Sequence, residues 1–332
     1  MAKTILGIDI GTDSMKLALC QGGRVKKAVS VPMPVNLVRE GRIVSTETMG
    51  ELLRGAMRDN GLHARYAAFV LPNDVTFVRS VTMPRMTADQ LAYNIPFEFN
   101  DYITDELKNY VFDYAMLSTP EELAAPDART MELMAVAAPA ALLEETQELL
   151  RHAGLKLIKA APAVSAYIAL IRAREAGAAF PAGEYCILDM GYQAIRMHIF
   201  HGERHMVTRI LEVGLSSLDE VIADRFNVDV HLAHTYLLSN YENCQTGEAC
   251  MNAYGNIAVE LMRALNFYSF SNVDSRLADV WLCGGGAAIE PLGAAIRETL
   301  DLNVHSAAEL LADAGALPDP YGFVQAIGIT MD

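Results

Sequence analysis

Short apolar runs that end in Asp-x-Gly mark the two most regular segments of the chain. Ile8-Asp9-Ile10-Gly11 is followed 180 residues later by Leu188-Asp189-Met190-Gly191. Other pairs that match at the same offset are Lys16 and Arg196, Gly22 and Gly202, and Arg24 and Arg204. Each copy predicts a strand, a tight turn and a second strand, which together form a β-hairpin. A repeat of this length indicates two related lobes within one chain.

The rest of the chain contains both predicted strands and predicted helices. Apolar runs predict strands over 67–71, 76–83, 131–137 and 280–283. Apolar positions on one face predict helices over 142–153, 213–226, 256–270 and 289–300, the second entered through a cap at Ser216 and Ser217. A stretch rich in Phe, Tyr and Asn covers 91–114, and residues 120–126 are expected to form an exposed loop.

Composition and charge narrow the function classes. Apolar residues make up 52% and charged residues 20% of the 332 residues, which indicates two packed domains rather than disorder. The 26 basic and 41 acidic side chains leave a formal charge of −15, which disfavours nucleic acid and anionic lipid as partners. The chain has no apolar run of about 18 residues, and Asp9 stands where a signal peptide needs apolar residues. We therefore expect a cytoplasmic protein without direct membrane insertion.

Cysteines and histidines give only weak metal signals. The five cysteines form no C-x-x-C pair and are expected to be buried free thiols in a reducing compartment. A strand would point His198 and His201 to opposite faces, so that a metal shared with His205 would need a bend. A second set contains zinc-type ligands whose spacing fits no common zinc motif: His231, His234, Cys244 and Cys250.

The two aspartates of the repeat suggest a divalent cation. Asp9 and Asp189 end apolar strands, where burying an ionised carboxylate is costly unless it is paired or faces a cation. If the two hairpins face one another across a cleft, both carboxylates could hold a hydrated Mg²⁺ ion, which prefers oxygen ligands and keeps several waters.

The turns after the aspartates are suited to phosphate. Segments 11–15 and 191–195 would present backbone N–H groups, and glycines 284–286 would admit a ligand and aim a helix N-terminus at it. The side chains expected to help in the first turn are Thr12, Ser14 and Lys16. An Asp-x-Gly alone usually marks only a turn, but two matched hairpins with a late glycine loop favour a phosphate site. The sequence contains neither a P-loop nor a G-x-G-x-x-G motif.

With these motifs the chain resembles the superfamily of actin, heat-shock chaperones and sugar kinases. Segment 8–16 matches the first phosphate hairpin of that superfamily, 188–191 the second and 282–286 the adenosine loop. The resemblance implies an actin-like, two-lobed α/β fold of duplicated ribonuclease H-like domains that binds ATP and Mg²⁺. The implied nucleotide-binding residues are Asp9, Gly11, Thr12, Asp13, Ser14, Lys16, Asp189, Gly191, Gly214, Glu260, Arg263, Gly284, Gly285 and Gly286, with Asp9 and Asp189 reaching the metal through water.

Two details of this resemblance concern single helices. Glu260 and Arg263, one turn apart, resemble the pair that the superfamily places against ribose and adenine. Gly328 resembles the glycine of its closing connecting helix.

Within the superfamily, the chain is most similar to the PilM family of type IV pilus assembly proteins. Segment 93–103 looks like the start of the extra subdomain that this family shares with the cell-division protein FtsA, and 131–158 looks like its continuation. The resemblance implies a groove between this subdomain and the first lobe. That groove would bind the N-terminal peptide of a PilN-type inner-membrane protein and hold the chain at the inner face of the membrane. The resemblance also allows two further kinds of contact, with pilus motor ATPases and between copies of this chain.

The resemblance also divides the chain into parts. The expected first lobe comprises 1–83, 160–180 and 321–332, and the expected inserted small subdomain comprises 84–159. The expected second lobe is 181–320, with 215–275 as its helical subdomain.

Departures from the superfamily pattern bear on activity. Tyr192 and Gln193 stand where small or hydroxylic residues are usual, and Gly214-Leu215 replaces a Gly-Gly pair. The small side chains of 160–165 cannot orient an attacking water well, so we expect weak ATPase activity or none. The rival functions are a small-molecule kinase, with Asp219 as its base, and an FtsA-like filament former, which the non-basic segment 327–332 disfavours.

Overall fold

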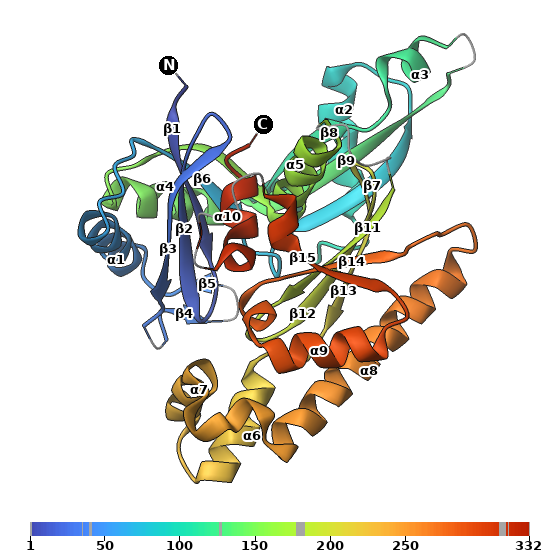
Figure 1. The fold of residues 1–332 in the computed structure, drawn as a ribbon. Coiled ribbons are helices and arrows are strands. Elements are labelled where there is room, and N and C mark those ends of the chain that lie inside the picture. The colour runs from blue at the N-terminus through green and yellow to red at the C-terminus, as the bar shows by residue number, and fades with distance from the viewer. Residues whose placement is uncertain are drawn as a thin grey trace. The chain divides into compact units, whose positions relative to one another are not determined.

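The chain divides into two compact units, each described by itself below. The computed structural model describes residues 2–34, 36–39, 42–125, 128–176, 183–311, 317 and 319–331. The first unit comprises Met1–Ala169 together with Gln325–Asp332, and the second comprises Leu170–Val324 (Figure 1). The division falls within helix α5 (Ala163–Ala176), whereas the expected boundary at 180 lies outside the described residues.

A five-stranded sheet forms the centre of the first unit, in the order β3-β2-β1-β6-β10. β1, β2 and β3 are antiparallel neighbours, and β6 and β10 extend the sheet in parallel. The strands are β1 (Thr4–Ile10), β2 (Ser14–Gln21), β3 (Arg24–Pro32), β6 (Tyr66–Leu71) and β10 (Lys156–Pro162).

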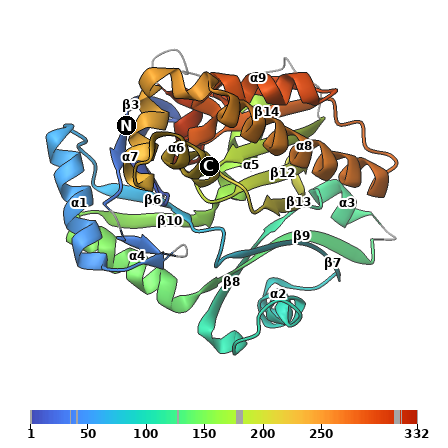
Figure 2. The ribbon, with the colours of Figure 1, turned by 90° about the horizontal axis from the view of Figure 1, so that it is seen from below.

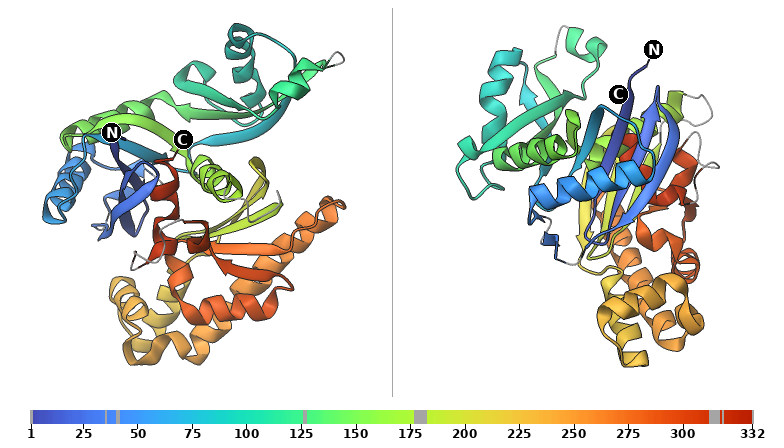
Figure 3. Two further views of the ribbon diagram at one scale, coloured as in Figure 1. Left: turned by 45° about the horizontal axis from the view of Figure 1, so that its top comes forward. Right: turned by 90° about the vertical axis from the view of Figure 1, so that its left-hand side faces the viewer.

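Helices cover both faces of this sheet. Helix α1 (Thr46–Asp59) is capped by Ser45 and packs with α4 (Ala140–His152) over the β1 residues Leu6 and Ile8 (Figure 3). On the other face, α10 (Val324–Gly328) lies so close to β1 that a Cβ atom on Gly7 would clash with the Ala326 carbonyl. Gly328 likewise meets the backbone of Ala166 in α5, so a glycine there permits the close helix crossing.

A smaller sheet lies at the other end of the first unit, in the order β7-β9-β8. Its strands are β7 (Phe77–Pro84), β8 (Tyr110–Met116) and β9 (Thr130–Pro139), with α2 (Ala88–Asn94) and the 3-10 helix η1 (Ile95–Phe99) packed on them (Figure 2). This layer starts at Phe77 and ends at Pro139. The expected subdomain 84–159 is therefore longer than this layer, because it also includes α4 and most of β10. Helix α4 packs on the large sheet and β10 is one of its strands, and apolar side chains of both belong to the core of that sheet.

The first unit also contains short strands and a short helix. β4 (Val38–Arg39) pairs with β5 (Arg42–Ile43). An exposed loop was expected over 120–126, but Pro120–Ala124 forms the short helix α3, so the predicted loop conformation was wrong there. Thr119 and Glu122 form a capping box and Pro120 suits a first helical turn. Residues 126 and 127 lie outside the described residues.

The second unit repeats the strand order of the first. Its sheet has the order β13-β12-β11-β14-β15, again with three antiparallel strands and two parallel ones. The strands are β11 (Glu184–Met190), β12 (Ile195–His201), β13 (Arg204–Leu211), β14 (Asp279–Cys283) and β15 (Asn303–Ser306). Asp189 pairs with Arg196 as Asp9 pairs with Lys16, so the predicted duplication of hairpins is confirmed residue by residue.

Four helices pack around this second sheet. They are α6 (Ser216–Phe226), α7 (Val230–Ser239), α8 (Glu248–Ser271) and α9 (Glu290–Thr299), and they share one apolar core with β11 and β12. Helix α6 starts three residues later than predicted because Val213 and Leu215 bond to the second hairpin instead. Helix α8 starts eight residues earlier than predicted, and its first turns bury Cys250 and Tyr254.

The cysteines and the longest helices can also be compared with the sequence analysis, for the residues that the structure describes. All five cysteines are buried and free, as predicted. Among the described helices, none is long and apolar enough to cross a membrane.

Candidate functional site

The first hairpin turn carries a carboxylate and an ammonium group side by side. The Gly11 N–H donates to the Ser14 carbonyl at 3.0 Å, which closes the turn between β1 and β2. Asp9 and Lys16 are directly opposite one another across the two strands, and such pairs share a face of the sheet. The Lys16 Nζ donates to the Ser14 carbonyl at 3.4 Å and therefore lies over the turn.

The remaining predicted residues of this turn keep part of their surface in solvent. Thr12, Asp13 and Ser14 are half-buried, and the Asp13 carbonyl accepts a hydrogen bond from the Met33 N–H at 2.8 Å. The bond ties the turn to the end of β3 and so fixes its backbone.

The second hairpin turn carries the same combination of charges. Asp189 is 8% exposed and lies directly opposite Arg196. The guanidinium Nη1 of Arg196 lies 3.8 Å from the position that a Cβ atom on Gly191 would take, so this cation also lies over its turn. Arg196 was absent from the residues predicted for the site. The match of Lys16 with Arg196 in the repeat was the signal that could have identified it.

The glycine loop contacts the second hairpin turn. Gly284 has φ +82°, and a Cβ atom there would lie 2.6 Å from the Asp189 Oδ1 and 2.9 Å from the Met190 carbonyl. Gly286 packs just as closely on Met190. The structure thus brings the glycine loop against Asp189 and Met190.

The exit from the glycine loop differs from the prediction. A 3-10 helix, η4 (Gly285–Ala288), intervenes, and α9 begins only at Glu290. The N-terminus of α9 therefore does not start at the glycines, because the short 3-10 turn first redirects the chain.

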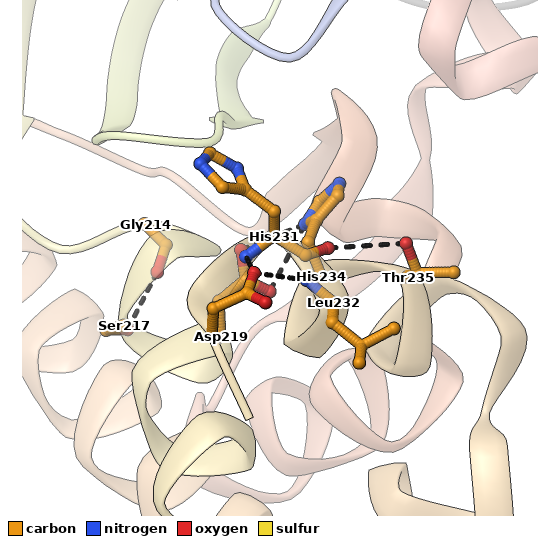
Figure 4. A network of polar contacts seen from close by, with 8 residues as sticks. Gly214, Ser217, Asp219, His231, Leu232, His234 and Thr235 are labelled. Atoms are coloured by element: carbon orange, nitrogen blue, oxygen red, sulfur yellow. Dashed lines mark hydrogen bonds and ion pairs between the residues drawn. The ribbon is translucent and has the colours of Figure 1, made fainter. Parts of the chain in front are cut away.

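The start of α6 is hydrogen-bonded to the second hairpin turn. The Leu215 N–H donates to the Gly191 carbonyl at 3.2 Å, and the Ser216 N–H donates to the Tyr192 carbonyl at 2.9 Å. A Cβ atom on Gly214 would clash with that same Tyr192 carbonyl, so only glycine fits at this position. Ser217 donates its hydroxyl to the Gly214 carbonyl at 2.7 Å (Figure 4), instead of the predicted helix cap.

A buried carboxylate–imidazole pair lies beneath this turn. Asp219, 1% exposed, accepts from the His234 Nδ1 at 2.9 and 3.2 Å and thereby joins α6 to α7 (Figure 4). The edge of the Tyr192 ring packs on the His234 ring, with centroids 5.2 Å apart. Both Asp219 oxygens are engaged, which argues against this residue as the base of a kinase. A substrate hydroxyl must come within hydrogen-bond reach of such a base.

The proposed metal clusters find no support in the part of the chain that the structure describes. No group of three or more His, Cys, Asp or Glu side chains there is arranged to hold a metal ion. Cys244 donates its thiol to the Tyr236 carbonyl at 3.2 Å. His198 and His205 are buried while His201 is exposed, as strand geometry predicted.

The pair expected at ribose and adenine lies on the exposed side of α8. Glu260 and Arg263 form an ion pair with each other, and their side chains are 52% and 67% exposed. The buried stripe of α8, which includes Ile257 and Leu261, is on a different face of the helix. An exposed pair of this kind contributes little to stability.

Each hairpin can therefore offer a carboxylate and a cation at a glycine turn. A guanidinium or ammonium group suits phosphate oxygens, and a carboxylate suits a hydrated divalent cation. The residues present thus fit the phosphates of a nucleotide together with Mg²⁺. A purely structural cross-strand ion pair explains the charges as well, but it does not explain why a glycine turn lies under the cation in both units.

Comparisons with known proteins identify the family of the chain. Residues 7–311 match the family model described as type IV pilus assembly protein PilM. A search of curated proteins by sequence found no match.

Solved structures give the fold. The chain resembles the PilM-PilN type IV pilus biogenesis complex with a TM-score of 0.84 and 22% identity, over 99% of this chain and 98% of that one. It also resembles the ethanolamine utilization protein EutJ from Carboxydothermus hydrogenoformans, with a TM-score of 0.61 and 15% identity, over 98% of this chain and 88% of that one. A third similar structure is MreB5 of Spiroplasma citri bound to ADP, with a TM-score of 0.53 and 11% identity, over 99% of this chain and 95% of that one. These likenesses confirm the predicted actin-like fold.

Proposed function

The chain belongs to the PilM family of type IV pilus assembly proteins, and on this basis we propose that it is a nucleotide-gated scaffold of pilus assembly. It binds Mg-ATP and recruits the N-terminal peptide of a PilN-type inner-membrane protein. It works in the cytoplasm, held at the inner face of the membrane by that partner. ATP fixes the relative angle of the two lobes, and its differential affinity for their open and closed arrangements sets the affinity for the peptide.

The matched hairpins carry the nucleotide proposal. Asp9 opposite Lys16 and Asp189 opposite Arg196 supply two carboxylates and two cations at glycine turns. The cations would hold the phosphates, the carboxylates would hold the waters of Mg²⁺, and the metal would neutralise phosphate charge. The residues assigned to the rest of the nucleotide are Gly11, Thr12, Asp13, Ser14, Gly191, Gly214, Gly284, Gly285 and Gly286, with Glu260 and Arg263 at the nucleoside.

Binding rather than turnover is the proposed role of the nucleotide. The junction of β10 and α5, residues 160–165, carries only small side chains, which cannot orient a water for attack. Asp219, the other candidate base, is occupied by His234. We therefore expect slow hydrolysis or none.

Exposed aromatic side chains in α2, in η1 and directly after η1 support the peptide proposal. Tyr93 is 72% exposed, Phe97 52% and Tyr102 50%. The Tyr93 and Phe97 rings meet edge to face at 5.7 Å, and the Arg79 guanidinium lies 4.2 Å from the centre of the Tyr102 ring. Exposed aromatic groups beside a cation are typical anchors of protein interfaces. One solved relative is a PilM-PilN complex, which is why we assign a PilN-type peptide to this surface.

Calorimetric titration with ATP, with and without Mg²⁺, tests the nucleotide proposal. We expect Mg²⁺ to strengthen binding, and Asp9→Ala to weaken Mg-ATP binding at least about tenfold because a carboxylate that orients metal-bound water is lost. Asp301→Ala removes an exposed loop carboxylate and is the matched control. Glu260→Ala tests the nucleoside contact separately. Unchanged affinity in Asp9→Ala would refute the assignment.

Capture on an immobilised N-terminal peptide of a PilN-type protein tests the partner proposal. We expect Tyr93→Ala combined with Phe97→Ala to reduce capture about tenfold or more, since two aromatic anchors are removed. Val273→Ala changes an apolar side chain that is 87% exposed in the other unit and should leave capture unchanged. Equal capture of all three proteins would contradict the assigned surface, whereas Mg-ATP binding would remain a separate result.

A further inference from the structure

A pocket with a basic lining opens on the first unit, where Thr4 and Tyr66 begin β1 and β6. The N-terminus of the chain leads into this end of β1 (Figure 1). The pocket has a volume of about 610 Å³ and lies between the C-terminal turns of α1, the start of β6 and the end of α4. We call it the basic pocket, because three arginines and a histidine line it: Arg54, Arg58, His63 and Arg65.

Further cations stand at the edge of the basic pocket. Lys3 Nζ lies 5.3 Å from the centre of the Tyr66 ring, and the Arg65 guanidinium lies 5.7 Å from it. Lys156 donates its backbone N–H to the Arg65 carbonyl and is exposed. None of the described residues that line the pocket is acidic, and the exposed Asp59 beside it pairs with Arg58. The pocket is therefore strongly positive in a chain whose formal charge is −15.

The second unit shows that the fold itself does not require these cations. The duplication gives the strand positions at this end of the first sheet, and the residues directly before them, counterparts at the same end of the second sheet. The counterparts are Glu184 for Thr4, Asp279 for Tyr66, Asn303 for Lys156, Gly183 for Lys3 and Ala278 for Arg65. Lys3, Arg65 and Lys156 of the first unit thus correspond to neutral residues in the second, and Thr4 and Tyr66 correspond to acidic ones. This difference points to a ligand of the first unit.

Part of the lining of the basic pocket is apolar, and we call this part the pocket floor. It consists of Met57, Leu62, Ala64 and Ala153, and Leu62 is only 2% exposed. An apolar floor combined with arginines in one pocket fits a ligand with one apolar group between negative charges. Arginine forks bind carboxylates with two parallel hydrogen bonds, which gives such a ligand a defined orientation.

We propose that the basic pocket docks a short acidic segment of a partner protein, with one large apolar side chain on the pocket floor and flanking Asp or Glu carboxylates on the arginines. A compact segment is favoured over a membrane or nucleic acid because those extended polyanions would also meet the acidic remainder of the molecule, and surface charges act over about 8 Å at physiological salt. This docking surface goes beyond the nucleotide and the PilN-type peptide.

Fluorescence anisotropy with a labelled decapeptide, built of Glu and Asp around one central Phe, tests the proposal on the full chain. We expect binding that weakens between about 50 and 200 mM salt and when Ser replaces the Phe. Arg54→Glu combined with Arg65→Glu should weaken peptide binding at least about tenfold. Arg54→Lys combined with Arg65→Lys keeps the positive charge but removes the guanidinium groups, and it should weaken binding less strongly. Arg85→Glu with Arg129→Glu, on exposed arginines of the small sheet, changes the charge equally and should have no effect.

Mg-ATP titration and the urea midpoint establish that each variant is folded; if the charge reversals unfold the protein, Arg54→Gln with Arg65→Gln replaces them in the same comparison. Equal peptide binding by wild type and pocket variants would overturn the proposal. Binding of wild type to phosphatidylglycerol vesicles that the pocket variants lose, without peptide binding, would assign the pocket to a membrane surface and overturn it as well.

Discussion

Replacing Gly284 with valine is expected to abolish Mg-ATP binding and to destabilise the second unit. Gly284 has φ +82°, a region in which a β-branched residue is strained. A Cβ atom there would also lie 2.6 Å from the Asp189 Oδ1, so the carboxylate proposed to serve Mg²⁺ would have to move. The two effects together should lower the free energy of unfolding by roughly 2–4 kcal/mol.

Urea unfolding and calorimetric titration with Mg-ATP measure the two effects separately. The titration is done at low temperature, where circular dichroism shows the variant to be folded. Gly255→Ala is the matched control, because Gly255 lies within α8 with nothing within 4 Å of its added Cβ, and alanine favours helix there. Wild-type Mg-ATP affinity in folded Gly284→Val would remove the glycine loop from the site.

The hairpins could be predicted from the sequence because their signals are local and occur twice. A strand, a turn glycine and a second strand lie within about 20 residues, and the second copy shows which residues belong to the pattern. Asp9 and Asp189 were placed correctly at strand ends. The repeat also held the match of Lys16 with Arg196, but only the cross-strand register shows that each cation lies directly opposite its aspartate.

Other parts of the site depend on contacts that the local sequence does not encode. The Asp219–His234 pair joins two helices, and nothing in the spacing of 15 residues marks it as a buried hydrogen bond. Helix α6 starts late because Gly214 and Leu215 are held by the second hairpin turn, a contact that overrides the helical pattern. Helix α3 was missed because a five-residue helix has too few apolar positions to show a period, although its capping box was visible at Thr119 and Glu122.

Acid should destabilise the second unit through two buried histidines. His198 and His205 are 1% and 5% exposed, and both rings bond the Thr208 hydroxyl, at 2.8 and 2.9 Å. Burial lowers the pKa of His205 to about 4. Burial lowers the pKa of His198 well below its usual value too, helped by the charges of His205 and Arg196. The fold thus holds both imidazoles in their neutral form.

The direction of the pH effect follows from these lowered pKa values. Between about pH 6.5 and about pH 4 the two histidines bind protons in the unfolded chain but not in the folded chain. Their contribution to the free energy of unfolding is therefore complete above that range and is lost as the pH decreases through it. For His205 alone the loss is roughly 3 kcal/mol. Midpoints of urea unfolding from about pH 8 to about pH 4.5 measure it.

A double variant isolates this contribution from that of the carboxylates. His198→Asn and His205→Gln replace the ring nitrogens that face Thr208 with amide groups, which do not titrate in this range. We expect the double variant to be less stable than wild type at neutral pH but to lose much less stability on acidification. His201→Gln changes the exposed histidine at the end of β12 and should keep the wild-type pH slope. If all three proteins lose stability in parallel, the buried histidines are not the acid-sensitive element.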